Sequence, residues 1–98
     1  MWRHGDILIA PVAAIPEKAK RRATTILARG ELTGHSHRIE EAETAVLWDC
    51  RGEMFLEVTA PQARVVHQEH KPITLPQGTY RFWFQREYTP QAIRRVVD

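Results

Sequence analysis

The chain has 98 residues, of which 43% are hydrophobic, and its formal net charge is only +2. A chain of this length has enough apolar material for one hydrophobic core and too little for two, so we expect a single domain over residues 1–98. Its one cysteine, Cys50, excludes an intramolecular disulfide framework and the cysteine-rich zinc patterns. We see no signal peptide and no apolar run of membrane-spanning length, so we expect a cytoplasmic protein with no membrane partner.

The first half of the chain shows short apolar runs between glycines, prolines and charged residues, which is typical of short strands. The charged stretch 17–22 allows a helical turn or the start of a strand, and we favour a loop. Arg51-Gly52 has the composition of a tight hairpin between two neighbouring strands. Strands are expected at 6–12, 23–28, 35–39, 44–49 and 53–59.

The second half continues this pattern. Pro61 opens a strand segment over 63–70, followed by a short one over 73–75. Pro76-Gln77-Gly78 has the composition of a turn, after which 79–87 is expected to form the longest and most aromatic strand. Thr89 as N-cap and Pro90 at the first helical position would allow one or two helical turns within 89–97, as a short C-terminal helix.

These elements predict an all-β fold, a single small β-barrel or two-sheet roll of short antiparallel strands. Residues in each strand alternate between the core and the other face. Since exposed strand edges are usually paired or covered, we expect a homodimer. The predicted core consists of Ile7, Ile9, Ile26, Val46, Trp48, Met54, Leu56, Val58, Val65, Tyr80, Phe82 and Phe84.

Histidine is the strongest functional signal, because four of the five histidines lie in two tight pairs. If 35–39 is extended, His35 and His37 share a face about 6.6 Å apart, close enough for two imidazoles to bind one metal ion. Glu40 or Glu41 could serve there as a ligand or orient an imidazole.

The second pair, His67 and His70, is three residues apart, so its members face opposite sides of a regular strand. On strict alternation His67 shares a face with Glu69, unless a bulge or a turn before Pro72 brings His70 round. We therefore expect a metal site made of His35, His37 and His67, completed by Glu69 or His70. Such ligands suit zinc, or iron where two histidines and one carboxylate bind on one face.

Gly34-His35-Ser36-His37 followed by Glu40 or Glu41, with the later Pro76-Gln77-Gly78 turn, resembles the two motifs of the cupins. The resemblance implies a small β-barrel with a metal bound by histidines. It covers about half of the chain, and Tyr80, Arg81 and Phe82 stand where a cupin has a further histidine ligand. The segments 34–38 and 70–88 are also similar to those of small uncharacterised bacterial and phage proteins, which implies no known activity.

Three functions follow as hypotheses. The first is a metal-binding β-barrel, which would be a metal-dependent enzyme if bound water attacks a small or anionic substrate that Arg38 or Arg81 steadies. The second is a non-enzymatic module that binds single-stranded nucleic acid or an acidic protein, because Arg81 and Trp83 alternate with core residues on one strand. The third is a structural or assembly protein of phage origin, in which the histidines serve folding or assembly.

Overall fold

The structure is a computed structural model that describes residues 1–30, 34–88 and 93–95, with side chains described as far as Gln85. In these ranges the chain forms antiparallel strands and one short 3-10 helix, and no α-helix. The all-β prediction is therefore confirmed. The elements are β1 (Trp2–His4), β2 (Ile7–Pro11), β3 (Lys20–Arg21), β4 (Ile26–Arg29), β5 (Ser36–Ile39), η1 (Ala42–Thr44), β6 (Ala45–Cys50), β7 (Glu53–Val66), β8 (Ile73–Phe84), β9 (Arg86–Tyr88) and β10 (Ile93–Arg95).

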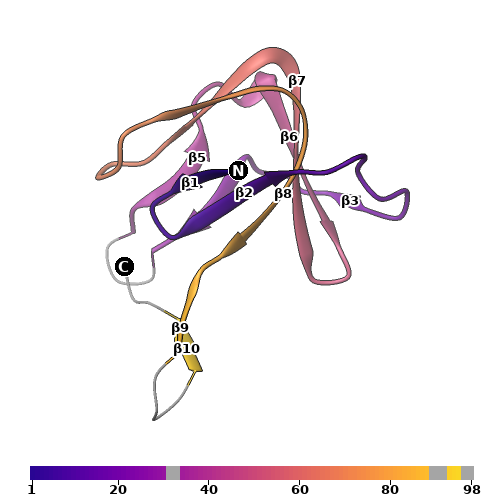
Figure 1. Ribbon diagram of the computed structural model, residues 1–98. Coiled ribbons are helices and arrows are strands. Elements are labelled where there is room, and N and C mark those ends of the chain that lie inside the picture. The colour runs from indigo at the N-terminus through magenta and orange to yellow at the C-terminus, as the bar shows by residue number, and fades with distance from the viewer. Residues whose placement is uncertain (31–33, 89–92, 96–98) are drawn as a thin grey trace.

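The first eight strands form one sheet in the order β1-β2-β8-β7-β5-β4, with β6 pairing with both β7 and β3 (Figure 1). The 14-residue strand β7 explains this branching, because its first half pairs with β6 and its last residues pair with β5. In the part of the chain that the structure describes, no pairing joins β1 to β4, so the sheet is strongly curved but not closed into a barrel.

The turn expected at Pro76-Gln77-Gly78 is wrong, because β8 runs without interruption through these residues. Opposite them, the register of β7 shifts between Val58 and Gln62, so a bulge in two paired strands replaces a chain reversal. The Gln77 side chain donates a 2.9 Å hydrogen bond across this bend to the Thr59 carbonyl. Pro76 and Gly78 thus bend the strand, and the reversal comes earlier, at residues 67–72.

The hydrophobic core lies on the concave face of the sheet. Most of the predicted core residues are buried there, with Met54 and Phe84 partly buried at its margin. The expected phase of β6 was wrong: Ala45 and Leu47 face the core, so Val46 and Trp48 face outward. The buried core consists of Ile7, Ile9, Leu27, Ile39, Ala45, Leu47, Leu56, Val58, Ala63, Val65, Leu75, Tyr80 and Phe82.

A paired arginine and aspartate fasten the short strand β3 to β6. Arg22 donates two hydrogen bonds to the Asp49 carboxylate, of 3.0 and 2.6 Å. The guanidinium also lies 6.0 Å from the centre of the Phe82 ring, on the core side of the sheet. Arg22 lowers the pKa of the Asp49 carboxyl. The loop expected over 17–22 is therefore wrong at Lys20–Arg21, where these contacts favour a strand.

The two ends of the chain differ from expectation. Residues 2–4 form an additional strand, β1, which pairs with β2 across the Gly5-Asp6 turn. The helix expected within 89–97 is wrong at Ile93–Arg95, which pairs with β9 as a hairpin. There, β-branched Ile93 and strand pairing outweigh the capping signal of Thr89 and Pro90, which lie outside the described residues. Among the described helical segments, none has the length and apolarity needed to cross a membrane.

Candidate metal site

All five histidines of the chain gather at one end of the core, although they come from three separate segments. His4 ends β1, His35 and His37 lie at the start of β5, and His67 and His70 lie in the turn after β7. The curvature of the sheet brings β1 close to β5, and the His4 and His37 ring centres are 5.0 Å apart. The site therefore depends on the fold as a whole.

The turn that joins β1 to β2 packs directly against the imidazoles. Gly5 has a φ of +63°, a conformation that side-chain-bearing residues rarely adopt. A Cβ atom at this position would lie 2.9 Å from His37 Cε1 and 2.9 Å from His70 Nε2. Glycine is therefore needed here both for the backbone conformation and for the close approach of two histidine rings.

His37 is the buried centre of the group. It is 2% exposed, and Arg38, the next residue along β5, points to the opposite side. Its Nδ1 atom lies 2.9 Å from His4 Nδ1, so one of the two nitrogens donates a proton to the other. Its Nε2 atom has no hydrogen-bond partner among the described residues, and the nearest carboxylate oxygen, Asp6 Oδ1, is 3.7 Å away.

The Asp6 carboxylate favours one arrangement of protons in this pair. A negative oxygen beside Nε2 of His37 stabilises the tautomer that carries its proton there, because the alternative places a lone pair against the negative charge. Which of the two Nδ1 atoms donates depends on the tautomers of both rings. The two rings thus share one proton at a separation of 2.9 Å.

The turn after β7 brings the second histidine pair together. Because β7 ends at Val66, strand alternation no longer applies to His67 and His70, and their ring centres are 4.6 Å apart. His67 Nδ1 accepts a 2.9 Å hydrogen bond from the Glu69 amide. The Gln68 side chain accepts a 3.1 Å bond from the Ser36 amide, which fastens the turn to β5.

Burial and mutual repulsion keep the inner imidazoles neutral. Burial, followed by the neighbouring His67, His4 and His70, lowers the pKa of His37 to about 3. Burial and then His70 also lower the pKa of His4, although the Lys71 backbone opposes the shift. A group of neutral imidazoles packed this closely offers nitrogen lone pairs at neutral pH.

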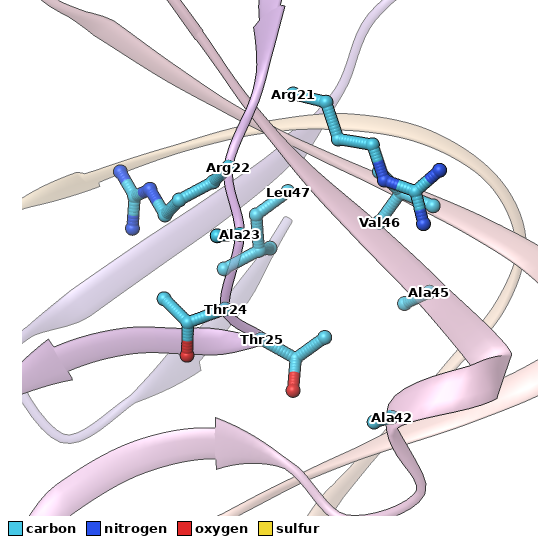
Figure 2. Close-up of a pocket in the computed structure, with 9 residues that line it drawn as sticks. All are labelled: Arg21, Arg22, Ala23, Thr24, Thr25, Ala42, Ala45, Val46 and Leu47. Carbon is cyan, nitrogen blue, oxygen red and sulfur yellow. The ribbon is translucent and has the colours of Figure 1, made fainter.

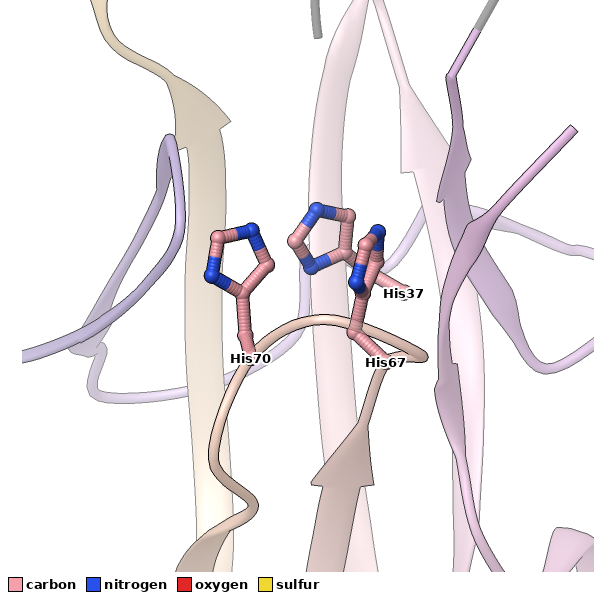
Figure 3. A group of neighbouring side chains, drawn as sticks. All are labelled: His37, His67 and His70. Atoms are coloured by element: carbon pink, nitrogen blue, oxygen red, sulfur yellow. The ribbon is translucent and has the colours of Figure 1, made fainter. Parts of the chain in front are cut away.

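Figure 3 shows the three imidazoles whose nitrogen atoms best suit a shared ligand, from His37, His67 and His70. One ligand atom from each lies within 4.8 Å of the other two. Their exposure increases outward, since His37 is buried, His67 is half-buried and His70 is exposed. Of the two completions left open by the sequence, His70 is the one in this group.

The other predicted site residues are arranged differently. His35 and Glu69 bind each other, with 2.6 Å between His35 Nδ1 and Glu69 Oε1, although the His35 ring remains 5.6 Å from that of His67. Arg38 points away from the histidines, and Arg81 lies on the convex face with a 3.0 Å ion pair to Glu53. The structure brings neither arginine to the histidine group.

His4 was missed by sequence reasoning, because it stands alone near the start of the chain and outside the two pairs. The only local signal was the sequence His4-Gly5-Asp6, which is typical of a tight turn and says nothing of a distant partner.

A separate hollow of about 360 Å³ lies between the 22–25 segment, η1 and β6 (Figure 2). Its polar lining comes mainly from Arg21, Arg22, Thr24 and Thr25. Arg22 is already bound to Asp49 and to the carbonyl of Ile26. The histidines do not line this hollow, so the two features are distinct.

Comparison with known proteins gives one match. A family model described as "Domain of unknown function (DUF8820)" matches residues 3–85. The chain belongs to the DUF8820 family. The matched part of this DUF8820 chain contains all five histidines. No curated protein and no solved structure matches the chain.

Proposed function

We propose that this DUF8820 protein binds one divalent transition metal ion through the imidazoles of His37, His67 and His70, with His4 as the fourth ligand. The observation that carries the proposal is the convergence of these rings, with ligand atoms of the first three within 4.8 Å of one another and His4 Nδ1 2.9 Å from His37. Four imidazoles from three segments of the chain suit a tetrahedral site.

The protonation of the group supports this proposal. A metal ion binds the neutral imidazole, so protons compete with it wherever the histidine pKa is near the working pH. The lowered pKa values of His37 and His4 remove most of this competition at neutral pH. Four imidazoles lie close together, and the inner two carry no positive charge. Their nitrogen lone pairs are therefore available to a metal ion.

The distance between His4 and His37 also suits a bound ion. Two nitrogens that bind one tetrahedral zinc ion at about 2.05 Å are separated by about 3.3 Å. The two Nδ1 atoms are 2.9 Å apart, so an ion would need a ring movement of a few tenths of an ångström. The proton that the two rings share would then move to the other nitrogen of its own ring or be released to solvent. Asp6 would then hold the proton on the outer nitrogen of His37, as carboxylates commonly do for metal-binding histidines.

The donor set favours zinc among the two metals considered. Imidazole nitrogens suit zinc, copper, nickel and iron, whereas magnesium and calcium prefer oxygen ligands. The carboxylate expected to complete an iron site, that of Glu69, binds His35 instead. Since Arg38 and Arg81 both point away, the proposal is confined to metal binding and includes no reaction.

Calorimetric titration of metal-free protein at neutral pH tests the proposal. We expect zinc to bind with one ion per chain and magnesium to give no binding heat. The His67→Ala, His70→Ala double variant removes the two more exposed ligands and should bind zinc at least 100-fold more weakly, by about 3 kcal/mol. Arg38→Ala, on the other side of β5, is the matched control and should bind as the natural protein does. Equal binding of zinc and magnesium, or no loss in the double variant, would contradict the proposal.

A further inference from the structure

The convex face of the sheet carries a row of arginine and aromatic side chains that the histidine site does not use. The strand registers place Arg21 opposite Trp48, Trp48 opposite Phe55, and Phe55 opposite Arg81. Residues directly opposite in antiparallel strands project from the same face. Arg21, Trp48, Phe55 and Arg81 therefore form one continuous row across β3, β6, β7 and β8, about 14 Å long.

A second aromatic ring extends this row along β8. Trp83 lies two residues after Arg81, and the Arg81 guanidinium stands 5.2 Å from the centre of its ring. Trp48 and Trp83 are both half-buried, whereas Phe55, which stands between Trp48 and Arg81 in the row, is buried. The Trp48 indole donates a 3.1 Å hydrogen bond to Glu57, which fixes the orientation of that ring.

Arginines outnumber glutamates on this face. Arg3 and Arg21 are exposed, and Arg51 stands in the hairpin at the end of the face. The two glutamates there are engaged, since Glu53 pairs with Arg81 and Glu57 accepts the Trp48 hydrogen. Figure 2 shows the Arg21 side chain directed toward Val46, on the outward side of β6, while Arg22 turns the other way toward the core.

We propose that this face, defined by Arg21, Trp48, Arg81 and Trp83, binds single-stranded nucleic acid. Unpaired bases can stack on half-buried tryptophans of a sheet. The arginines at the two ends of the row can bind the phosphates on either side of the stacked bases. Single strands fit better than a duplex, because a duplex keeps its base faces stacked internally and offers nothing for the tryptophan rings. An acidic polypeptide such as polyglutamate would pair with the arginines but has no bases to stack on the rings.

The proposal is independent of the metal site, because the histidines lie at the end of the opposite, concave face. Arg81 and Trp83 alternate along β8 with Tyr80 and Phe82, which belong to the core. Zinc and a chelator should therefore leave nucleic-acid binding unchanged, so the failure of one proposal does not affect the other.

Fluorescence anisotropy with labelled oligothymidylate and oligouridylate of about 15 nucleotides tests the proposal. We expect binding that weakens steeply between about 50 and 200 mM salt. The Arg21→Ala, Arg81→Ala double variant should bind at least tenfold more weakly. The negative slope of log affinity against log salt should become shallower by about 1.4, because each of the two lost phosphate contacts contributes about 0.7.

Two further variants separate the sources of binding. Arg29→Ala, Arg64→Ala removes the same charge from exposed positions on β4 and the far half of β7, and should change the affinity less than twofold. Trp83→Leu keeps every charge and should weaken binding about tenfold through lost stacking. Thermal unfolding of each variant confirms that it is folded.

The other outcomes each overturn the proposal. These are the absence of binding to either oligonucleotide at low salt, a preference for duplex DNA, or an equal loss in the two double-arginine variants. Binding of polyglutamate that matches the oligonucleotides and does not change in Trp83→Leu would assign the face to an acidic protein instead.

Discussion

The stability of the metal-free protein should fall as the pH falls from 7 to 5, because two buried histidines are held neutral. His37 has a pKa of about 3 in the folded chain, against an ordinary value of 6.5, and the pKa of His4 is also lowered. Between pH 7 and pH 5 the unfolded chain takes up protons on these two histidines, and the folded chain does not. The free energy of unfolding therefore rises with pH across this window and falls on acidification.

The size of the effect follows from the two pKa values of His37. The pKa of His37 is 6.5 in the unfolded chain and about 3 in the folded chain. This difference makes the free energy of unfolding about 2 kcal/mol lower at pH 5 than at pH 8. The largest slope that one such histidine can give is about 1.4 kcal/mol per pH unit, and the lowered pKa of His4 steepens the curve in the same direction. Asp49 has a lowered carboxyl pKa and contributes only at more acidic pH.

Urea unfolding in the presence of a chelator, measured at intervals from pH 8 to pH 5, provides the assay. The natural protein should lose at least about 2 kcal/mol over this range. His37→Leu removes the titrating group and should flatten the curve by the contribution of His37, whatever its stability at pH 8. The reasoning is refuted if the natural protein is equally stable at pH 5 and pH 8, or if the variant shows the same slope.

Two further predictions concern the packing around the site. Gly5→Ala should lower the free energy of unfolding by at least about 1 kcal/mol and weaken zinc binding. The added Cβ would strain the turn and press on His37 and His70. Unchanged thermal unfolding and zinc affinity would contradict this prediction. Zinc should also break the hydrogen bond from the Glu69 amide to His67 Nδ1, because binding at either nitrogen leaves no Nδ1 lone pair for that amide. The Glu69 amide signal in a nitrogen–proton NMR spectrum should then move on zinc addition, and a stationary signal would show that His67 is not a ligand.

Much of the fold was predictable because strand alternation and hairpin composition are local signals. Residues 53–58 and 80–84 show the period of two that places Leu56 and Phe82 in the core, and Arg51-Gly52 forms the expected hairpin. The bend at Pro76-Gln77-Gly78 could not be distinguished from a turn, since the same residue types suit both. Only the pairing of β7 with β8 decides between them.

The phase of β6 was unpredictable for a different reason. Its apolar residues run consecutively from Ala45 to Trp48, so alternation gives no preference for either face. The two phases differ in which residues pack against the core, and that choice depends on the register with β7. Trp48 consequently joins the convex row and not the core.

The candidate site was predictable in its residue types but not in its composition. His37, His67 and His70 could be proposed because each belongs to a tight pair of histidines in the sequence. The contribution of His4 depends on the curvature of the sheet that brings β1 to β5, which no local pattern encodes. The pairing of His35 with Glu69 likewise depends on how the 67–70 turn lies against β5.

Elemental analysis of the purified protein after zinc reconstitution tests the central claim most directly. The natural protein should hold one zinc ion per chain, the His67→Ala, His70→Ala variant should hold none, and His35→Gln should still hold one, because the His35 ring nitrogen binds Glu69. A natural protein that retains no zinc, or a double variant that retains as much as the natural protein, would contradict the account.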